Sequence, residues 1–283
     1  MIVKNLNSTE PIVTTEWLKT YINDPNLIIL DASPASNVAG LVPEYTNIQI
    51  PGARHFNVKH DFSDLDNPIP NMLPPVHQFN NGCRKLGINN ESRIVIYDNL
   101  GVYMSPRVRW MFKVMGHEQV AVLDGGLSAW INMGLPTEPK KENVYSSGNF
   151  SGKYQPELVK TSDEVLESVS SKNVLVMDAR SKGRFEGTVA EPRADLRSGR
   201  IPGSVNIPFK RVLKDGHFKS KNELREIFNQ HQPEDRRLVF TCGSGITACI
   251  IMLAAELVMT NPKAVYDGSW SEWGKQTQFP VEI

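Results

Sequence analysis

Cysteine is scarce in this sequence. The 283 residues include three cysteines, Cys83, Cys242 and Cys249, and none belongs to a Cys-x-x-Cys pair. So sparse and odd a set argues against a disulfide framework. The histidines form no His-Glu-x-x-His motif and no pair with cysteine at ligand spacing, so we predict neither a metal nor a cofactor. A reducing compartment fits this pattern, and we predict a cytoplasmic protein.

An excess of charge of one sign and long apolar runs are also missing. Lysine plus arginine equals aspartate plus glutamate at 31 each, so no net field favours nucleic acid or an anionic membrane. The longest apolar run, residues 246–259, is interrupted by Glu256 and falls short of the roughly 20 residues of a membrane helix. Residues 1–13 lack the features of a signal peptide. We therefore predict no nucleic-acid or membrane partner.

Two phosphate-binding motifs are absent as well. No Gly-x4-Gly-Lys-Ser/Thr loop is present. A cysteine phosphatase needs an arginine as the sixth residue after its cysteine, and the residue at that distance from Cys242 is Ala248. Phosphoryl chemistry is excluded at this cysteine.

What the sequence does contain is an internal repeat. The same strand, turn and Asp-Gly signals occur twice, in the same order and at similar spacing. The paired segments are 27–32 with 174–179, 50–53 with 201–204, 93–98 with 237–242, and 124–130 with 267–273. The repeat places Asp98 where the second copy has Cys242, so we expect one active half and one half that shapes a cleft.

Apolar strands rich in Val, Ile and Leu alternate with helical segments, which indicates an α/β fold. We predict two tandem domains, residues 1–140 and 156–283, each a parallel sheet flanked by helices. The Pro-, Lys- and Ser-containing segment 136–155 is predicted to link them. The predicted helices span residues 15–21, 76–86, 107–115, 163–169, 221–229 and 247–259.

Cys242 lies at the end of an apolar strand, in a Gly-Ser-Gly turn that leads into a helix. Two glycines allow positive φ and a tight turn, so that backbone N–H groups can point at the sulfur. The unpaired N–H groups and the dipole of the helix N-terminus add to this effect. The pattern favours a thiolate and therefore a nucleophile.

These segments together resemble the tandem-domain rhodanese-like sulfurtransferases over nearly the whole chain. The motifs that carry the resemblance are the Cys242 loop, 178–180 (Asp-Ala-Arg), both Ile-Pro-Gly turns, 105–107 (Ser-Pro-Arg) with Trp110, 124–126 and 267–270. In that family the amino-terminal domain is catalytically silent, and the carboxyl-terminal cysteine cycles through a persulfide. The resemblance implies the same roles for Asp98 and Cys242.

The loop also resembles one group of the family. Members similar to 3-mercaptopyruvate sulfurtransferase carry Cys-Gly-Ser-Gly-Val-Thr-Ala, and this chain differs only at Ile246. Members that prefer thiosulfate have an Arg-Lys pair at the positions of Gly243 and Ser244, because a dianion needs positive charge. The resemblance implies that Arg184 and Arg193 bind the donor's carboxylate, for which arginine has bidentate geometry. The alternative is that both are surface arginines paired with nearby acidic residues.

The expected reaction begins with attack of Cys242 on the sulfur of 3-mercaptopyruvate, which releases pyruvate and leaves a persulfide. A small thiol, a thioredoxin-like protein or cyanide then accepts the outer sulfur. Ser244 either shuttles a proton or is only a small turn residue. Backbone N–H groups of Gly243, Gly245, Ile246 and Thr247 are expected to bind substrate, and Thr247 is a candidate helix cap.

One segment departs from the family pattern. Mercaptopyruvate-type members carry an acidic residue and a histidine before Met-Leu-Pro, and here the histidine position is Asn71. His60 and Asp61 lie near the acidic position, shifted by one residue, and either replace the pair or are surface residues. Two alternatives for the whole chain stay open: a thiosulfate:cyanide sulfurtransferase, and a non-enzymatic persulfide carrier or regulatory module. Trp270 and Trp273 are predicted to pack at the domain junction.

Overall fold

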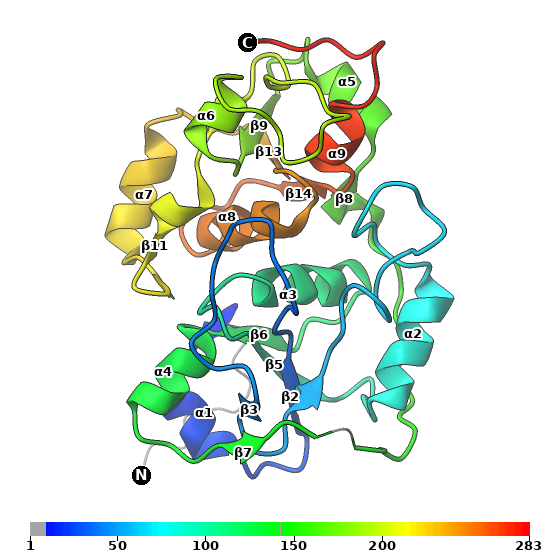
Figure 1. Cartoon of the computed structure of the whole chain (residues 1–283), viewed down its shortest axis with the longest axis vertical. Coiled ribbons are helices and arrows are strands. Elements are labelled where there is room, and N and C mark those ends of the chain that lie inside the picture. Colours follow the sequence, from blue (N-terminus) through cyan, green and yellow to red (C-terminus); the bar gives the residue numbers. More distant parts are fainter. Residues whose placement is uncertain (1–9, 142) are drawn as a thin grey trace.

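A computed structural model describes residues 10–141 and 143–283, which form two α/β halves stacked end to end (Figure 1). Most of the segment 1–13, where the sequence has no signal-peptide features, lies outside the described residues, as does the start of the predicted domain 1–140. The described residues contain no helix that is both long and apolar enough to cross a membrane.

The first half is built on a five-stranded parallel sheet with the order β1-β6-β5-β2-β4. Its strands are β1 (Ile12–Val13), β2 (Leu27–Asp31), β4 (Arg54–His55), β5 (Arg93–Tyr97) and β6 (Val120–Leu123). The central strands β2 and β5 are buried after their first residue, as expected for a sheet covered on both faces.

The second half repeats this sheet with the order β10-β9-β13-β14-β8, again all parallel. Its strands are β8 (Val159–Lys160), β9 (Val174–Asp178), β10 (Val205–Asn206), β13 (Arg237–Thr241) and β14 (Lys263–Tyr266). Read from its other edge, the second sheet has the order β8-β14-β13-β9-β10. When the strands of each half are taken in chain order, the two sheets therefore have the same topology. The α/β fold and the duplication predicted from the sequence are confirmed.

The six predicted helices are present within a few residues of their expected ends. They are α1 (Thr15–Tyr21), α2 (Val76–Lys85), α3 (Ser105–Val114), α5 (Ser162–Ser168), α7 (Lys221–Asn229) and α8 (Ile246–Glu256). Three short helices were not predicted: α4 (Gly126–Asn132), α6 (Lys182–Phe185) and α9 (Ser269–Trp273). The remaining short elements are β3 (Ile48–Gln49), β7 (Glu138–Pro139), β11 (Leu213–Lys214), β12 (His217–Phe218), η1 (Pro156–Leu158) and η2 (Phe209–Val212).

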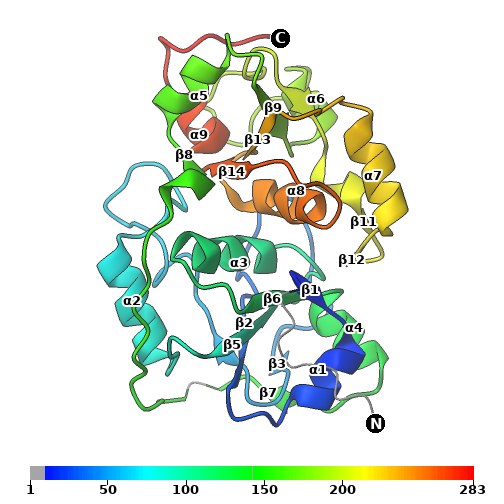
Figure 2. The same cartoon turned by 180° about the vertical axis from the view of Figure 1, so that it is seen from behind.

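Helices α3 and α8 pack against each other between the two sheets, as both views show (Figures 1 and 2). Both are almost entirely buried, and the largest apolar cluster runs through them from one half into the other. The prediction that Trp270 and Trp273 lie at this junction is wrong. Both belong to a separate cluster within the second half, with Ile201, Val239 and Phe279.

The segment 136–155, predicted as a linker, is attached to the first half. Its strand β7 pairs antiparallel with β3, and its backbone N–H groups at Gly148 and Phe150 donate to the carbonyls of Arg84 and Ile88. The Phe150 side chain is buried among aromatic rings of that half. The sequence of this segment shows no periodicity, but one buried side chain and its backbone hydrogen bonds fix its course.

Candidate active site

The strand-to-helix turn after β13 holds Cys242 at the carboxyl edge of the second sheet. Cys242 follows the last residue of β13, and α8 begins four residues later. Gly245 is the N-cap of α8 with φ +76°, so the predicted cap at Thr247 is wrong: Thr247 lies inside the first turn. Gly243 is not among the residues with positive φ, so one glycine rather than two supplies the left-handed conformation.

Ser269 ties this turn together from the adjacent strand end. Its hydroxyl accepts hydrogen bonds from the N–H groups of Cys242 (3.2 Å) and Gly245 (3.1 Å) and donates to the carbonyl of Tyr266. The N–H groups of Gly243 and Ser244 have no partner among the described residues. Together with the first-turn N–H groups of α8, they are the donors left to stabilise an anion at the turn.

The first half shows what such a turn does with an anion. Asp98 follows β5 as Cys242 follows β13, and its buried carboxylate accepts from the N–H groups of Leu100, Tyr103, Met104 and Ser105 at 2.8–3.0 Å. The Ser105 hydroxyl donates as well, at 2.7 Å. Burial raises the pKa of Asp98, and these hydrogen bonds oppose the rise. The duplicated turn therefore gathers donors on an anion, which in the second half would be the thiolate.

A buried chain of ion pairs places Arg184 beside the turn. Arg180 is paired with Asp178 and with Glu191, and its guanidinium stacks on Trp270 at 4.1 Å. Glu191 in turn binds Arg184, with Oε2 2.5 Å from Nη2. A Cβ at Gly243 would lie 3.0 Å from that same Nη2, so any larger residue would push the guanidinium a few tenths of an ångström away from the loop. Part of the Arg184 side chain stays exposed, at 19%.

Cys242 opens into a cavity of about 300 Å³, here called the cysteine cavity. The second half lines it with the loop, with Arg180 and Arg184, and with Phe209 and Lys210. The first half contributes Val38, Ala39 and Tyr103. This agrees with the expectation that the first half shapes a cleft. Burial and the nearby Cys242 charge raise the pKa of Tyr103 to about 12, so its phenol remains a neutral donor.

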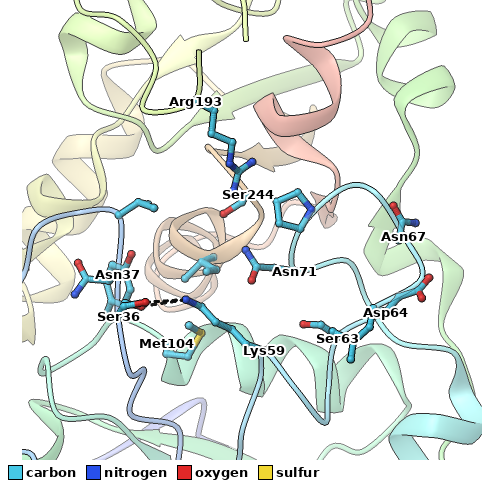
Figure 3. A pocket seen from close by; sticks show the side chains of 15 residues that line it. Ser36, Asn37, Lys59, Ser63, Asp64, Asn67, Asn71, Met104, Arg193 and Ser244 are labelled. Carbon is cyan, nitrogen blue, oxygen red and sulfur yellow. Dashed lines mark hydrogen bonds between the residues drawn. The ribbon is translucent and has the colours of Figure 1, made fainter. Parts of the chain in front are cut away.

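A second cavity of about 350 Å³, the outer cavity, adjoins the first (Figure 3). Both cavities are lined by Val38, Tyr103, Ser244 and Ile246. Arg193 lines the outer cavity and points toward Ser244, while its Nη1 donates to the Ser271 hydroxyl at 2.6 Å. The two predicted arginines therefore lie in neighbouring cavities with Ser244 between them.

The remaining predicted residues fall into two groups. Gly243, Ile246 and Thr247 line the cysteine cavity, whereas Gly245 is enclosed by Arg107 and Asp267. Asn71 lines the outer cavity, and its carbonyl accepts from Arg107 Nη2 at 2.6 Å. His60 and Asp61 line neither of the two cavities among the described residues.

Several residues at the site were not found from the sequence: Tyr103, Phe209, Lys210, Lys59 and Asp64. Three of them come from loops of the first half. Nothing local in the sequence marks those loops, because they reach the site only when α3 packs against α8. Tyr103 alone had a signal, since it lies two residues before the motif at 105–107.

Within residues 10–141 and 143–283, no group of three or more His, Cys, Asp or Glu side chains is arranged to hold a metal ion. The site is built from a cysteine, backbone donors and arginines. Such a set suits attack by sulfur on an anionic substrate.

Comparison with known proteins identifies the family of the chain. The model of the rhodanese-like domain matches residues 14–133 and 161–276, one match in each half. The chain belongs to the rhodanese-like family. It is 37% identical to the 3-mercaptopyruvate sulfurtransferase of Escherichia coli K12, over 97% of this chain and 99% of that protein. It is 41% identical to the thiosulfate sulfurtransferase of Rattus norvegicus, over 93% of this chain and 91% of the relative.

A solved structure of a related protein has the same fold. The crystal structure of SseA from Escherichia coli, described as a 3-mercaptopyruvate sulfotransferase, matches with a TM-score of 0.81 at 34% identity, over 93% of this chain and 99% of that one. This rhodanese-like chain is therefore an enzyme, a sulfurtransferase that acts on a small sulfur donor. Because relatives named for either donor are similarly close, the donor must be inferred from the site.

Proposed function

We propose that this sulfurtransferase takes sulfur from 3-mercaptopyruvate, holds it as a persulfide on Cys242, and passes it to a thiol or to cyanide. The observation that carries the proposal is the position of Arg184. The loop residues Gly243 and Ser244 bring no charge of their own, and Arg184 lies against Gly243 at the side of the cavity. That arrangement suits a donor whose carboxylate is separated from its sulfur by a short carbon chain.

In the first step the Cys242 thiolate attacks the donor's sulfur and forms an S–S bond. The donor's C–S bond breaks, and its electron pair passes to carbon as the enolate of pyruvate. The proton of the donor's thiol finally resides on that carbon, which leaves pyruvate and a persulfide anion. We assign the proton transfer to Ser244, which borders both cavities.

The other groups act on charge and position. The N–H groups of Gly243, Ser244, Ile246 and Thr247 stabilise negative charge on sulfur, and Gly245 shapes the turn. Arg184 binds the donor's carboxylate, and Arg193 approaches it from the outer cavity. In this proposal domain 156–283 carries the chemistry, and domain 1–140 is silent because Asp98 occupies the turn where the nucleophile would lie.

One observation favours thiosulfate as a second donor. Lys210 lines the cysteine cavity and forms no ion pair with any described residue, so it offers a free positive charge to a dianion. The ratio of kcat/KM for the two donors separates the candidates. A higher value for thiosulfate would show that the neutral loop does not set the preference.

The variant that tests the role of Arg184 in binding the donor's carboxylate is Arg184→Ala. We expect it to lower kcat/KM for 3-mercaptopyruvate by roughly 10- to 100-fold, the range of a charge-assisted hydrogen bond, and to affect sulfur uptake from inorganic polysulfide far less. Lys182→Ala on the same short helix is the control, because Lys182 is exposed and only paired with Glu186. An equal loss of rate with 3-mercaptopyruvate and with polysulfide would show that Arg184 does not bind the donor's carboxylate.

We also propose the cytoplasm as the location, since the three cysteines are free, which agrees with a reducing compartment. One relative, from Arabidopsis thaliana, is named as mitochondrial. Fractionation of cells that express the full chain decides between the two: recovery with a mitochondrial marker would overturn the proposal.

A further inference from the structure

The outer cavity holds two charges that the donor reaction does not use, Lys59 and Asp64, beside Arg193, which also approaches the donor. Lys59 and Arg193 approach it from opposite sides, and Asp64 lies on a third side, near Asn67 (Figure 3). Lys59 and Asp64 come from the first half and Arg193 from the second. Two positive charges and one negative charge therefore line a cavity of about 350 Å³.

None of these three charges forms an ion pair with a described residue. The ammonium of Lys59 donates only to the hydroxyl (3.1 Å) and carbonyl (3.4 Å) of Ser36. Arg193 uses one of its five N–H groups on Ser271, and an oxygen of Asp64 accepts only from the N–H of Asp66. Two cations and one carboxylate thus face a common space with their charge unmatched by the protein.

A ligand that carries both a carboxylate and an ammonium group matches this arrangement. Lys59 and Arg193 would bind the carboxylate, and Asp64 would bind the ammonium. Ser244 and Ile246 line both cavities, so such a ligand would lie next to the Cys242 loop. We propose that the outer cavity is the acceptor subsite and that it selects a small thiol with an α-amino acid group, such as cysteine.

The second half-reaction is then a thiol exchange that balances without any other reagent. The acceptor's thiolate attacks the outer sulfur of the Cys242 persulfide and forms a new S–S bond. The S–S bond to Cys242 breaks, its electron pair returns to Cys242 as the thiolate, and the acceptor leaves as a persulfide. Because pyruvate has left before the acceptor enters, Arg193 can serve each substrate in turn.

This inference rests on the proposed persulfide at Cys242 but not on the identity of the donor. The test therefore loads the enzyme with inorganic polysulfide and follows the disappearance of the persulfide by stopped flow. Four acceptors are compared: cysteine, 3-mercaptopropionate, which lacks the ammonium, cysteamine, which lacks the carboxylate, and 2-mercaptoethanol, which lacks both. Each thiol is compared with itself across variants, so its intrinsic reactivity cancels.

We expect Lys59→Met to slow cysteine and 3-mercaptopropionate by roughly 5- to 10-fold, the weight of one partly exposed charged hydrogen bond, and to change the other two less than 2-fold. Asp64→Asn is expected to slow cysteine and cysteamine only. Lys59→Arg restores the rate with cysteine. Lys172→Met, at an exposed lysine preceding β9, is the matched control and leaves all four rates unchanged.

Equal slowing of all four thiols by Lys59→Met would overturn the inference, because it would indicate a structural role. So would loss of the 3-mercaptopropionate rate in Asp64→Asn. Failure to release pyruvate from 3-mercaptopyruvate contradicts the proposed donor instead, and leaves the polysulfide-loaded experiment intact.

Discussion

Each of the three cysteines has a different environment. Cys242 is nearly buried but opens into a cavity, whereas Cys83 and Cys249 are fully buried in the apolar cluster. Burial raises the pKa of Cys249 to about 12 and that of Cys83 well above its usual value. The Cys249 thiol also donates to the carbonyl of Gly245 at 3.2 Å. These contacts make it part of the support of the loop and not a second nucleophile.

This contrast predicts the reactivity of the thiols. At about pH 8, the folded protein treated with iodoacetamide is expected to gain one label, on Cys242, because the other two stay protonated and enclosed. Peptide mass spectrometry locates the label. In Cys242→Ser no label is expected, and rapid labelling of Cys83 or Cys249 in the folded protein would contradict the assignment.

The sequence was informative for residues that bring their own local motif. Cys242 with its glycines could be found in this way, whereas Arg184 was found only through the resemblance to a family. Lys59 and Asp64 could not, because each is an ordinary charged residue in an irregular loop. Their significance comes from a cavity that forms only when the two halves meet.

At the scale of the element, the turn between β13 and α8 depends on one backbone conformation. Gly245 has φ +76°, and a Cβ there would lie 2.9 Å from Arg107 Nη1 and from the carbonyl of Asp267. The long helices were predictable because apolar residues recur along them and glycine follows two of them. The short helix α6, which carries Arg184, has four residues and therefore no periodicity to detect.

Substitution separates strain from crowding at this turn. Gly245→Ala is expected to destabilise the protein by more than Gly203→Ala and to abolish most activity. Gly203 has φ +71° with nothing within 4 Å of an added Cβ, so its variant carries only the backbone penalty of about 1–2 kcal/mol. Urea unfolding and the rate of persulfide formation measure the two effects. Equal losses of stability with full activity in both variants would mean that crowding at Gly245 is unimportant.

At the scale of the whole molecule, a buried ion pair joins the halves next to the active turn. Arg107 Nη1 lies 2.5 Å from Asp267 Oδ1, and both side chains are almost fully buried. The second oxygen of Asp267 accepts from the N–H of Leu73 at 2.7 Å, while Arg107 holds the carbonyl of Asn71. The pair therefore fixes the segment that lines the outer cavity. The repeat predicted two similar halves, but it carried no information on this contact between them.

Removing one member of the pair leaves a buried charge without its partner. Arg107→Met is expected to lower the free energy of unfolding by about 3–5 kcal/mol. Lys160→Met removes the more exposed pair with Glu164 and is expected to cost less than about 1 kcal/mol. Urea denaturation compares the two variants. A similar small loss in both would argue that the Arg107–Asp267 pair does not hold the halves together.

The central claim is that Cys242 carries the transferred sulfur. Its most direct test is a single turnover of excess protein with 3-mercaptopyruvate, quenched by acid and analysed for pyruvate and for the mass of the Cys242 peptide. We expect one pyruvate for each donor consumed, with one sulfur atom added to that peptide, and neither product in Cys242→Ser. Pyruvate released without sulfur on Cys242, or sulfur found on another cysteine, would contradict the account.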